Sequence, residues 1–223
     1  MTIAEQITRA KSDLDAVYAA GKAKGDNALE YAARLEYLYY QAEFPPEHDE
    51  LTVHAPNVGV NIGSMFRSST GLKKLDLDIP PNKAYDGSYF FNLNSSAAST
   101  ILEINLPDGI KFSNFGRFVR YCATLEKISG TIDLSECTST DLCFQACAAL
   151  EEVSFVTNTI KLGFDISYSK NLSGDSIKSI ANGLAPATTL QTLTVPASLV
   201  STFVEYGLTE TKLQAINWEL KGK

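Results

Sequence analysis

An apolar motif that recurs at intervals of 24 to 29 residues constrains the fold of this chain more than any other feature. Each copy has four positions, and each position lies three residues after the one before it. They hold, in order, an apolar or small residue, a small residue, a Leu or Ile, and a further apolar residue. The copies are Phe66, Ser69, Leu72 and Leu75; Ser95, Ala98, Ile101 and Ile104; Val119, Cys122, Leu125 and Ile128; and Phe144, Cys147, Leu150 and Val153. A weaker fifth copy ends in Leu190, Leu193 and Val195. A unit of this length cannot bury its own apolar face, so the units are expected to stack into a solenoid.

Each unit is expected to contribute two short strands. Three copies carry another apolar residue two places after the motif, and such alternation is typical of a strand with one buried face. These residues are Leu77, Leu106 and Phe155. A second alternation follows most units, at Ile110 and Phe112, at Ile132 and Leu134, and at Leu162, Phe164 and Ile166.

The four cysteines, Cys122, Cys137, Cys143 and Cys147, are expected to be buried free thiols. A disulfide pair or a zinc site is the alternative. However, the cluster contains no C-x-x-C pair, and both histidines of the chain lie far upstream of it. Stacking places Cys122 and Cys147 in an inward ladder of small residues, where larger side chains do not fit.

The C-terminal end of the stack is expected to contain helices. Ser173 can cap a helix that ends at Gly183. Its apolar face would consist of Ile177, Ile180, Ala181 and Leu184. After Pro196, a short helix and a last strand are expected to close the open end. Their apolar residues are Leu199, Phe203 and Val204 in the helix and Ile216, Trp218 and Leu220 in the strand.

Residues 1–46 are predicted to form a helical segment that anchors or oligomerises the protein. Apolar positions follow a heptad through three turns of the repeat, which favours a coiled coil, with a trimer as the preferred homo-oligomer. These positions are Ile3, Ile7, Ala10, Leu14 and Val17. The alternative is that this stripe packs on a second helical stretch or on the first repeat. Pro45 and Pro46 end that stretch, so residues 47–223 are assigned to the solenoid and its C-terminal cap.

Parts of the chain are similar to known families. The segments Gly63–Pro80 and Leu142–Phe155 resemble the irregular leucine-rich repeats of bacterial surface antigens, and the similarity runs from about Leu51 to Leu220. The opening MTIAEQITRAKSDLDAVYAAGKAKG and the closing INWELKGK resemble repeat proteins of phages and prophages of gut Firmicutes, which are usually taken to be tail or other virion appendages. Together the repeat and the resemblance imply an α+β fold, a leucine-rich-repeat solenoid with short parallel strands after a helical segment.

Composition and missing motifs narrow the function. A net charge of -7 repels polyphosphate and anionic lipid, so neither nucleic acid nor a membrane is expected as a partner. The first residues lack the apolar core of a secretion signal, which favours an extracellular location reached as part of a virion. No common nucleotide-binding, metalloprotease or hydrolase motif occurs, so we expect no enzyme, no cofactor and no metal site.

The candidate contact residues lie on surfaces. Tyr85 and Tyr89 are the candidates for an exposed aromatic contact, whereas Phe90 and Phe91 are expected to pack in the core. Solenoids usually bind through one long face, and its free strand positions supply the polar candidates. These are Lys73, Asp76, Glu103, Glu126 and Glu151, with Gln191 and Thr194 further along the same face.

The first hypothesis is a non-catalytic virion protein. The helical segment would contact other virion proteins, and the solenoid would contact a host-surface protein or glycan. The alternative is a cell-surface or secreted adhesin of a bacterium. A carbohydrate-active enzyme is disfavoured because no convergent acid pair supplies the acid and the nucleophile or base that glycoside hydrolysis needs.

Overall fold

The computed structural model describes residues 49–54, 59–67 and 71–223. The helical segment predicted for residues 1–46 lies outside these ranges, and so do its candidate oligomerisation residues. They are Ile3, Ile7, Ala10, Leu14 and Val17. The coiled coil and the boundary between residues 1–46 and 47–223 therefore stay predictions.

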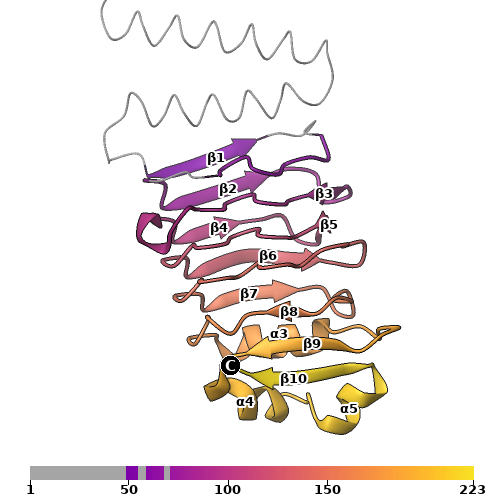
Figure 1. The fold of residues 1–223 in the computed structure, drawn as a ribbon. Helices are drawn as coiled ribbons and strands as arrows, with labels where there is room; N and C mark the ends of the chain where they lie inside the picture. Colours follow the sequence, from indigo (N-terminus) through magenta and orange to yellow (C-terminus); the bar gives the residue numbers. More distant parts are fainter. Residues whose placement is uncertain (1–48, 55–58, 68–70) are drawn as a thin grey trace, which may run out of the picture.

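The described chain winds into a stack of turns, and one side of the stack is a column of parallel strands (Figure 1). We call this side the first face. Its strands are β1 (Glu50–His54), β2 (Lys74–Asp78), β4 (Glu103–Asn105), the first half of β6 (Lys127–Asp133) and β7 (Glu152–Phe155). Each strand pairs in parallel with the next along the column.

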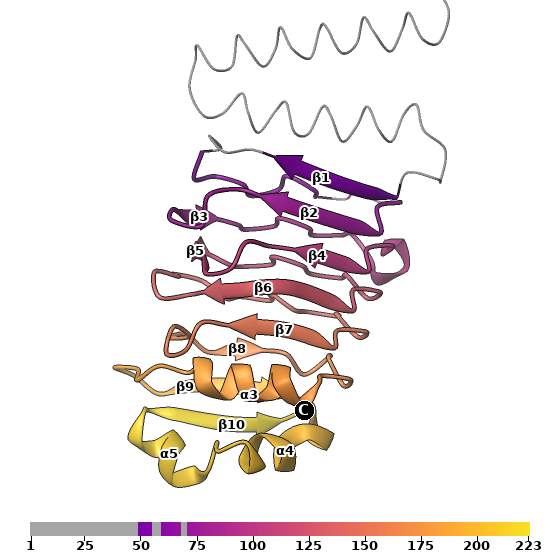
Figure 2. The same cartoon turned by 180° about the vertical axis from the view of Figure 1, so that it is seen from behind.

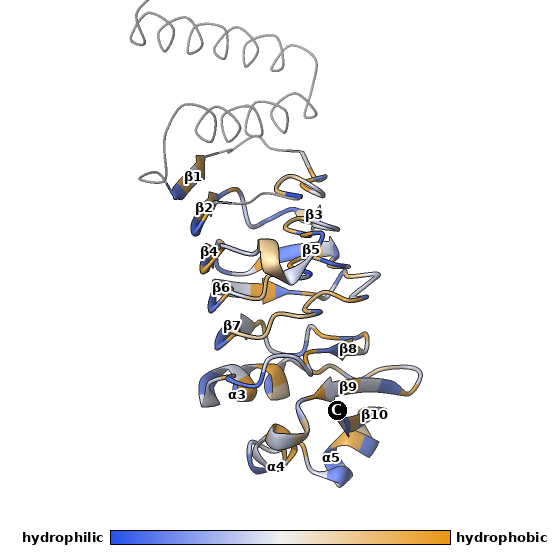
Figure 3. Cartoon of the chain, turned by 60° about the vertical axis from the view of Figure 1, so that its left-hand side comes forward, coloured by the Kyte–Doolittle hydropathy of each residue, from blue (hydrophilic) through white to orange (hydrophobic). Residues whose placement is uncertain are grey.

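The opposite side of the stack, the second face, holds a second column of strands (Figure 3). Its members are β3 (Ala84–Asp86), β5 (Ile110–Asn114), β8 (Phe164–Asp165), β9 (Gln191–Val195) and β10 (Trp218–Gly222). Strand β6 belongs to both columns, because Lys127 pairs with Glu103 of β4 while Ile132 pairs with Ile110 of β5. The seven-stranded sheet therefore curls around the core, and β8, β9 and β10 form a three-stranded parallel sheet below it.

The expected class, an α+β leucine-rich-repeat solenoid, is wrong. The described residues form a curled, all-parallel sheet with few helices. Between the strands of the upper part, the chain returns through tight turns instead of helices. These turns contain residues with positive φ four places apart, at Arg117 and Tyr121 and at Leu142 and Ala146. A left-handed residue at such intervals prevents a right-handed helix from propagating.

The strand register confirms part of the predicted repeat alignment. Leu75 of β2 pairs with Ile104 of β4, which in turn pairs with Ile128 of β6. The predicted second strands at Ile110 and Ile132 also pair with each other. Equivalent apolar residues therefore lie over one another in successive turns, as the motif predicts.

The start of the second copy was placed wrongly. The amide of Phe91 donates to the carbonyl oxygen of Phe118 at 2.7 Å, and this bond aligns Phe91, not Ser95, with the first position of the next copy. The extra residues form a single 3-10 turn, η1 (Ser96–Ala98), and Ala98 is only half-buried. An inserted turn cannot be located from a motif that tolerates small residues at two of its four positions.

A ladder of phenylalanine rings fills the core along the stack. The ring of Phe118 stacks on those of Phe90 and Phe115, with centroid distances of 5.0 and 4.4 Å. Phe115 continues to Phe144 with an edge-to-face contact at 5.7 Å. All four side chains have an exposed fraction of 0%. Phe66 and Phe164 extend the ladder at its two ends. Aromatic pairs at these distances stabilise a core beyond the area that they bury.

The cysteines are free thiols, as predicted. They are Cys122, Cys137, Cys143 and Cys147. Cys122 and Cys147 lie in the core and donate from Sγ to the carbonyl oxygens of Phe91 and Val119, at 3.1 and 3.0 Å. The expected ladder of small inward residues is therefore present at these two positions. Cys137 is only half-buried, which corrects the expectation for that residue.

Helix α3 (Gly174–Gly183) follows β7 on the first face and confirms the helix predicted there (Figures 2 and 3). Ser173 caps it, since its hydroxyl accepts a hydrogen bond from the amide of Ser176 at 3.2 Å. The predicted apolar residues Ile177, Ile180, Ala181 and Leu184 are buried. The helix takes the place that the next strand of the first face would occupy.

Two serines of α3 close the open edge of β7. The hydroxyl of Ser176 accepts from the amide of Val153 at 3.0 Å, and that of Ser179 accepts from the amide of Phe155 at 2.8 Å. An unpaired strand edge is a template for pairing with other chains, and buried amides without an acceptor cost free energy. These two serines therefore end the first-face sheet.

The C-terminal residues cover the lower end of the stack. After β9 come η2 (Ala197–Leu199), α4 (Val200–Glu205), α5 (Glu210–Ala215) and β10. The predicted short helix and last strand are confirmed at α4 and β10, whereas α5 was not predicted. Thr209 caps α5 by accepting from the amide of Lys212. Trp218 fixes β10 by donating from its indole nitrogen to the carbonyl oxygen of Ala185 at 2.8 Å.

Candidate binding surface

The outward side chains of the first face alternate in charge from strand to strand. The register places Glu50, Lys74, Glu103, Lys127 and Glu152 in one column. Neighbouring strands lie about 4.8 Å apart, so each charge has the opposite charge beside it. Lys127 Nζ lies 2.8 Å from a carboxylate oxygen of Glu152, and this hydrogen bond raises the pKa of Lys127. The column therefore mixes three carboxylates with two ammonium groups, and Lys127 and Glu152 form an ion pair within it.

The polar candidates from the sequence lie on this face or along its edge. Asp76 and Glu103 are half-buried strand residues. Lys73, Glu126 and Glu151 are exposed at the turn that precedes the strands, where the amide of Glu151 donates to the carbonyl oxygen of Glu126 at 2.8 Å. The structure thus brings the five residues to one side of the molecule. Lys73 already forms an ion pair with a neighbouring aspartate at 2.7 Å.

Tyr85 is not an exposed contact residue, which corrects the prediction. It is the middle residue of β3, and its side chain points into the core with an exposed fraction of 0%. Its hydroxyl donates to the carbonyl oxygen of Pro80 at 2.8 Å, and burial raises the pKa of Tyr85 to about 12. Phe90 and Phe91 are buried, as predicted. The position of Tyr85 in β3 explains the error, because the aromatic run of the sequence does not show which residue points inward.

Tyr89 remains a candidate, because it lies half-buried in the tight turn that follows β3. Its φ is 59°, in the left-handed region, which turns the ring out of the core. The guanidinium carbons of Arg67 and Arg117 lie 5.6 and 5.0 Å from the ring centroid. Arg117 Nη1 also donates a hydrogen bond to the tyrosine hydroxyl. The ring is therefore held in one orientation at the surface.

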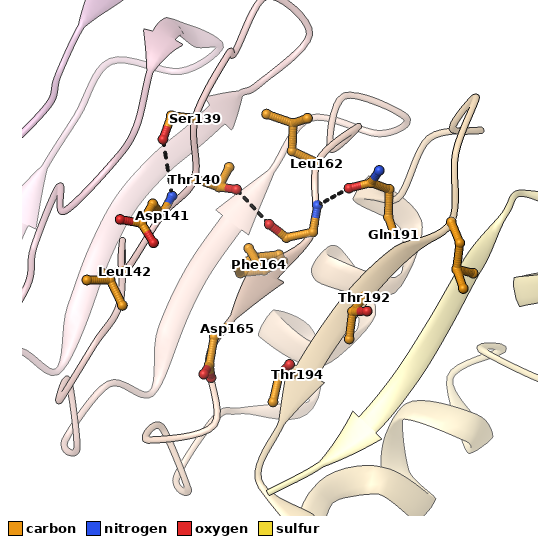
Figure 4. Close-up of a pocket in the computed structure, with 12 residues that line it drawn as sticks. Ser139, Thr140, Asp141, Leu142, Leu162, Phe164, Asp165, Gln191, Thr192 and Thr194 are labelled. Carbon is orange, nitrogen blue, oxygen red and sulfur yellow. Dashed lines mark hydrogen bonds between the residues drawn. The ribbon is translucent and has the colours of Figure 1, made fainter.

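An open groove with a volume of about 590 Å³ lies on the lower part of the second face (Figure 4). Three successive segments of the stack line it: residues 139–142 of a tight turn, residues 162–165 around β8, and residues 190–194 in and before β9. The groove crosses the place where the curled sheet gives way to the three-stranded sheet. Its walls come from the turn of residues 139–142 and from the segments that contain β8 and β9 of the three-stranded sheet.

Hydrogen bonds to one glycine set the width of the groove (Figure 4). Thr140 Oγ1 donates to the carbonyl oxygen of Gly163 at 2.7 Å, and the amide of Gly163 donates to Gln191 Oε1 at 2.8 Å. A Cβ on Gly163 would lie 2.8 Å from the carbonyl oxygen of Thr192. Because that contact is too short for any side chain, a glycine is required where the three segments approach each other.

The groove combines hydrogen-bonding groups with three leucines. The Asp141 side chain is 64% exposed, and that of Asp165 is 37% exposed at the end of β8. Thr192 and Thr194 project from β9 into the same space (Figure 4). The leucines of the lining are Leu142, Leu162 and Leu190, and Leu190 is 66% exposed. Carboxylates and hydroxyls next to aliphatic side chains suit a ligand that carries hydroxyl groups on an apolar frame.

Sequence reasoning found only part of this groove. Gln191 and Thr194 were expected on the first face, but β9 pairs with β8, so both lie on the second face. Asp141 and Asp165 were not singled out. Leu190 was assigned to the apolar motif of a fifth copy, which is wrong, since its side chain is exposed. The sequence around an apolar residue in an alternating run does not show whether its side chain lines a groove or packs in the core.

Within residues 49–54, 59–67 and 71–223, no group of three or more His, Cys, Asp or Glu side chains could hold a metal ion. In the same ranges no helix has the length and apolar character needed to cross a membrane. Comparisons of the chain with known protein families, with curated proteins and with solved structures each found no match.

Proposed function

We propose that this protein is a non-catalytic recognition protein that binds a surface glycan in the groove of the second face. The observation that carries the proposal is the lining of the groove. The carboxylates of Asp141 and Asp165 offer acceptors for sugar hydroxyls, and the hydroxyl of Thr194 offers a donor and an acceptor. The hydroxyl of Thr192 donates to Glu219 Oε1 at 2.6 Å and so offers an acceptor. Leu190 offers an aliphatic surface for the apolar face of a sugar ring.

The construction of the groove also supports recognition by a rigid site. The hydrogen bonds of Gly163 to Thr140 and Gln191 join its three walls before any ligand binds. A site whose walls are fixed in advance loses little conformational entropy on binding. The groove is open along one side, so an extended chain of sugars fits it without a closing movement.

The setting that we propose is a phage virion, in which the protein is part of a tail or another appendage. This part of the proposal rests on the resemblance of the two ends of the chain to phage and prophage repeat proteins. Residues 1–46 would contact other virion proteins or further copies of the chain, and the stack would present the groove to the host surface.

An array of immobilised oligosaccharides tests the proposal. The array carries neutral, carboxylated and phosphorylated sets, and the full chain is titrated to obtain apparent Kd values. Leu190→Asn removes the exposed wall of the groove, and Val60→Asn changes a residue that is 56% exposed and does not line the groove. Loss of a leucine contact is expected to weaken binding about ten-fold.

The control variant decides the interpretation. Binding that is weakened by Leu190→Asn and unchanged by Val60→Asn supports the groove. No glycan binding by the unmutated chain, or equal binding by both variants, contradicts the proposal.

A further inference from the structure

The three arginines among the described residues gather at one corner of the molecule. Arg117 and Arg120 lie in the tight turn that follows β5, and Arg67 lies in the turn that follows the isolated bridge between Asn61 and Asp86. The amide of Tyr89 donates to the carbonyl oxygen of Gly116 at 3.0 Å, so the turns of Tyr89 and Arg117 lie directly over each other. We call these three arginines together with Tyr89 and Tyr121 the arginine corner. It is a local concentration of positive charge on a chain whose net charge is -7.

Neighbouring side chains hold the guanidinium groups in place. Arg67 and Arg117 lie against the ring of Tyr89, as described above. The guanidinium carbon of Arg120 lies 4.4 Å from the ring centroid of Tyr121, and its Nε donates to Gln145 Oε1 at 2.6 Å. Stacking and hydrogen bonding of this kind orient an arginine without removing its charge.

The corner carries more positive charge than its partners neutralise. Within the described residues, the ion pair of the corner joins Arg117 Nη2 to a carboxylate oxygen of Asp141 at 3.7 Å. That distance is longer than a direct hydrogen bond, and Asp141 is largely exposed. The Arg117 side chain is 32% exposed, and its Nη2, which faces Asp141, is the group that a further anionic partner would contact.

The arginine corner adjoins the groove. The amide of Arg117 donates to the carbonyl oxygen of Asp141 at 2.8 Å, which places Leu142 one turn below Arg117 in the same column. Asp141 and Leu142 line the groove. A ligand that extends from the groove along this column therefore reaches the guanidinium groups directly.

We infer that the glycan bound by this protein is acidic, with a carboxylate or phosphate group seated on Arg117 beside Arg67 and Arg120. The inference rests on the proposed function and adds the charge of the ligand to it. Planar guanidinium groups bind carboxylates and phosphates through paired hydrogen bonds, which neutral sugars cannot form.

The same array tests the inference with matched sets of oligosaccharides, which share a backbone and carry no charge, a carboxylate or a phosphate. The full chain is expected to bind one charged set about ten-fold more tightly than the neutral set at low salt, and added salt should reduce this preference. The set that is preferred identifies the anion as carboxylate or phosphate.

Variants of the corner provide the second readout. Arg117→Gln and the exposed Arg67→Gln are expected to abolish the preference for the charged set while leaving binding to the neutral set unchanged. Lys170→Gln, which removes an exposed charge outside the corner, should keep the preference. Thermal unfolding checks that each variant is folded. If Arg117→Gln does not fold, Arg67→Gln alone provides the test.

The outcomes separate the two proposals. Equal binding of charged and neutral sets, with no effect of the arginine variants, overturns the inference and leaves the groove as a glycan site. No binding to any set overturns both.

Discussion

A Cβ on Gly130 would lie 2.2 Å from the carbonyl oxygen of Leu106. Gly130 is the residue at which β6 leaves the first face for the second, and its φ is 82°. The curl of the sheet thus depends on a close approach between this glycine and the chain one turn above. The motif has an aliphatic residue at this position in other copies, and only a residue without a side chain fits here.

Gly130→Ala is therefore expected to destabilise the protein by about 3 kcal/mol or more, because it adds a backbone clash to the strain of a positive φ. Gly109→Ala is the matched control. Gly109 has a φ of 69° but no atom within 4 Å of its Cβ position, so only the strain of about 1 kcal/mol is expected. Urea unfolding of both variants measures the difference. A similar loss of unfolding free energy in Gly130→Ala and Gly109→Ala would contradict this account, because it would show that the contact with Leu106 adds nothing to the cost.

How far the sequence predicts this fold depends on which interaction is considered. The column of Leu75, Ile104 and Ile128 was predictable, because stacked units repeat the same local environment. The curl was not, since it depends on Gly130 meeting Leu106, a contact between residues of different turns. The same holds for α3, whose limits follow from local capping, while its role at the edge of β7 depends on tertiary hydrogen bonds.

The candidate site was harder to predict than the fold. The exposed charges of the first face follow from strand alternation. Which opposite charges lie beside each other depends on the strand register, which spacing alone does not give. The groove exists because β9 joins β8 on the second face, and no local pattern around Gln191 or Leu190 distinguishes that pairing from one with β7.

Ser179→Ala is expected to lower the free energy of unfolding by about 1 to 3 kcal/mol, because it leaves the amide of Phe155 without its acceptor. Ser201→Ala changes an exposed serine of α4 and should stay within about 0.5 kcal/mol of the unmutated protein. Amide hydrogen exchange gives a local readout, since the Phe155 amide should lose protection in the first variant only. Unchanged protection there would contradict the role of α3 as the end of the sheet.

The buried thiols are expected to react slowly in the native protein. Burial raises the pKa of Cys147 to about 12 and holds those of Cys122 and Cys143 well above the ordinary value, so little reactive thiolate forms near neutral pH. Alkylation should modify Cys137 first, and all four thiols should react after unfolding without reductant. Rapid labelling of Cys147 in the native state would contradict this burial.

The raised pKa of Cys147 also predicts how the stability of the protein changes at alkaline pH. The pKa of Cys147 in the folded state lies above its ordinary value of 9.0, so its contribution to stability is complete below about pH 9. That contribution is lost as the pH rises toward about 12. Urea midpoints measured at pH 7, 8 and 11 should be equal at the first two values and lower at the third. The fall should be smaller in Cys147→Ala, which has no group to ionise there.

The most direct test of glycan recognition by the second face is a footprint of the bound ligand. Amide hydrogen exchange of the full chain is measured with and without the oligosaccharide that binds best on the array. Protection is expected in residues 139–142, 162–165 and 190–194, and the strands β2 and β4 of the first face should be unchanged. Protection confined to the first face, or none in the groove at a saturating ligand concentration, would contradict the account.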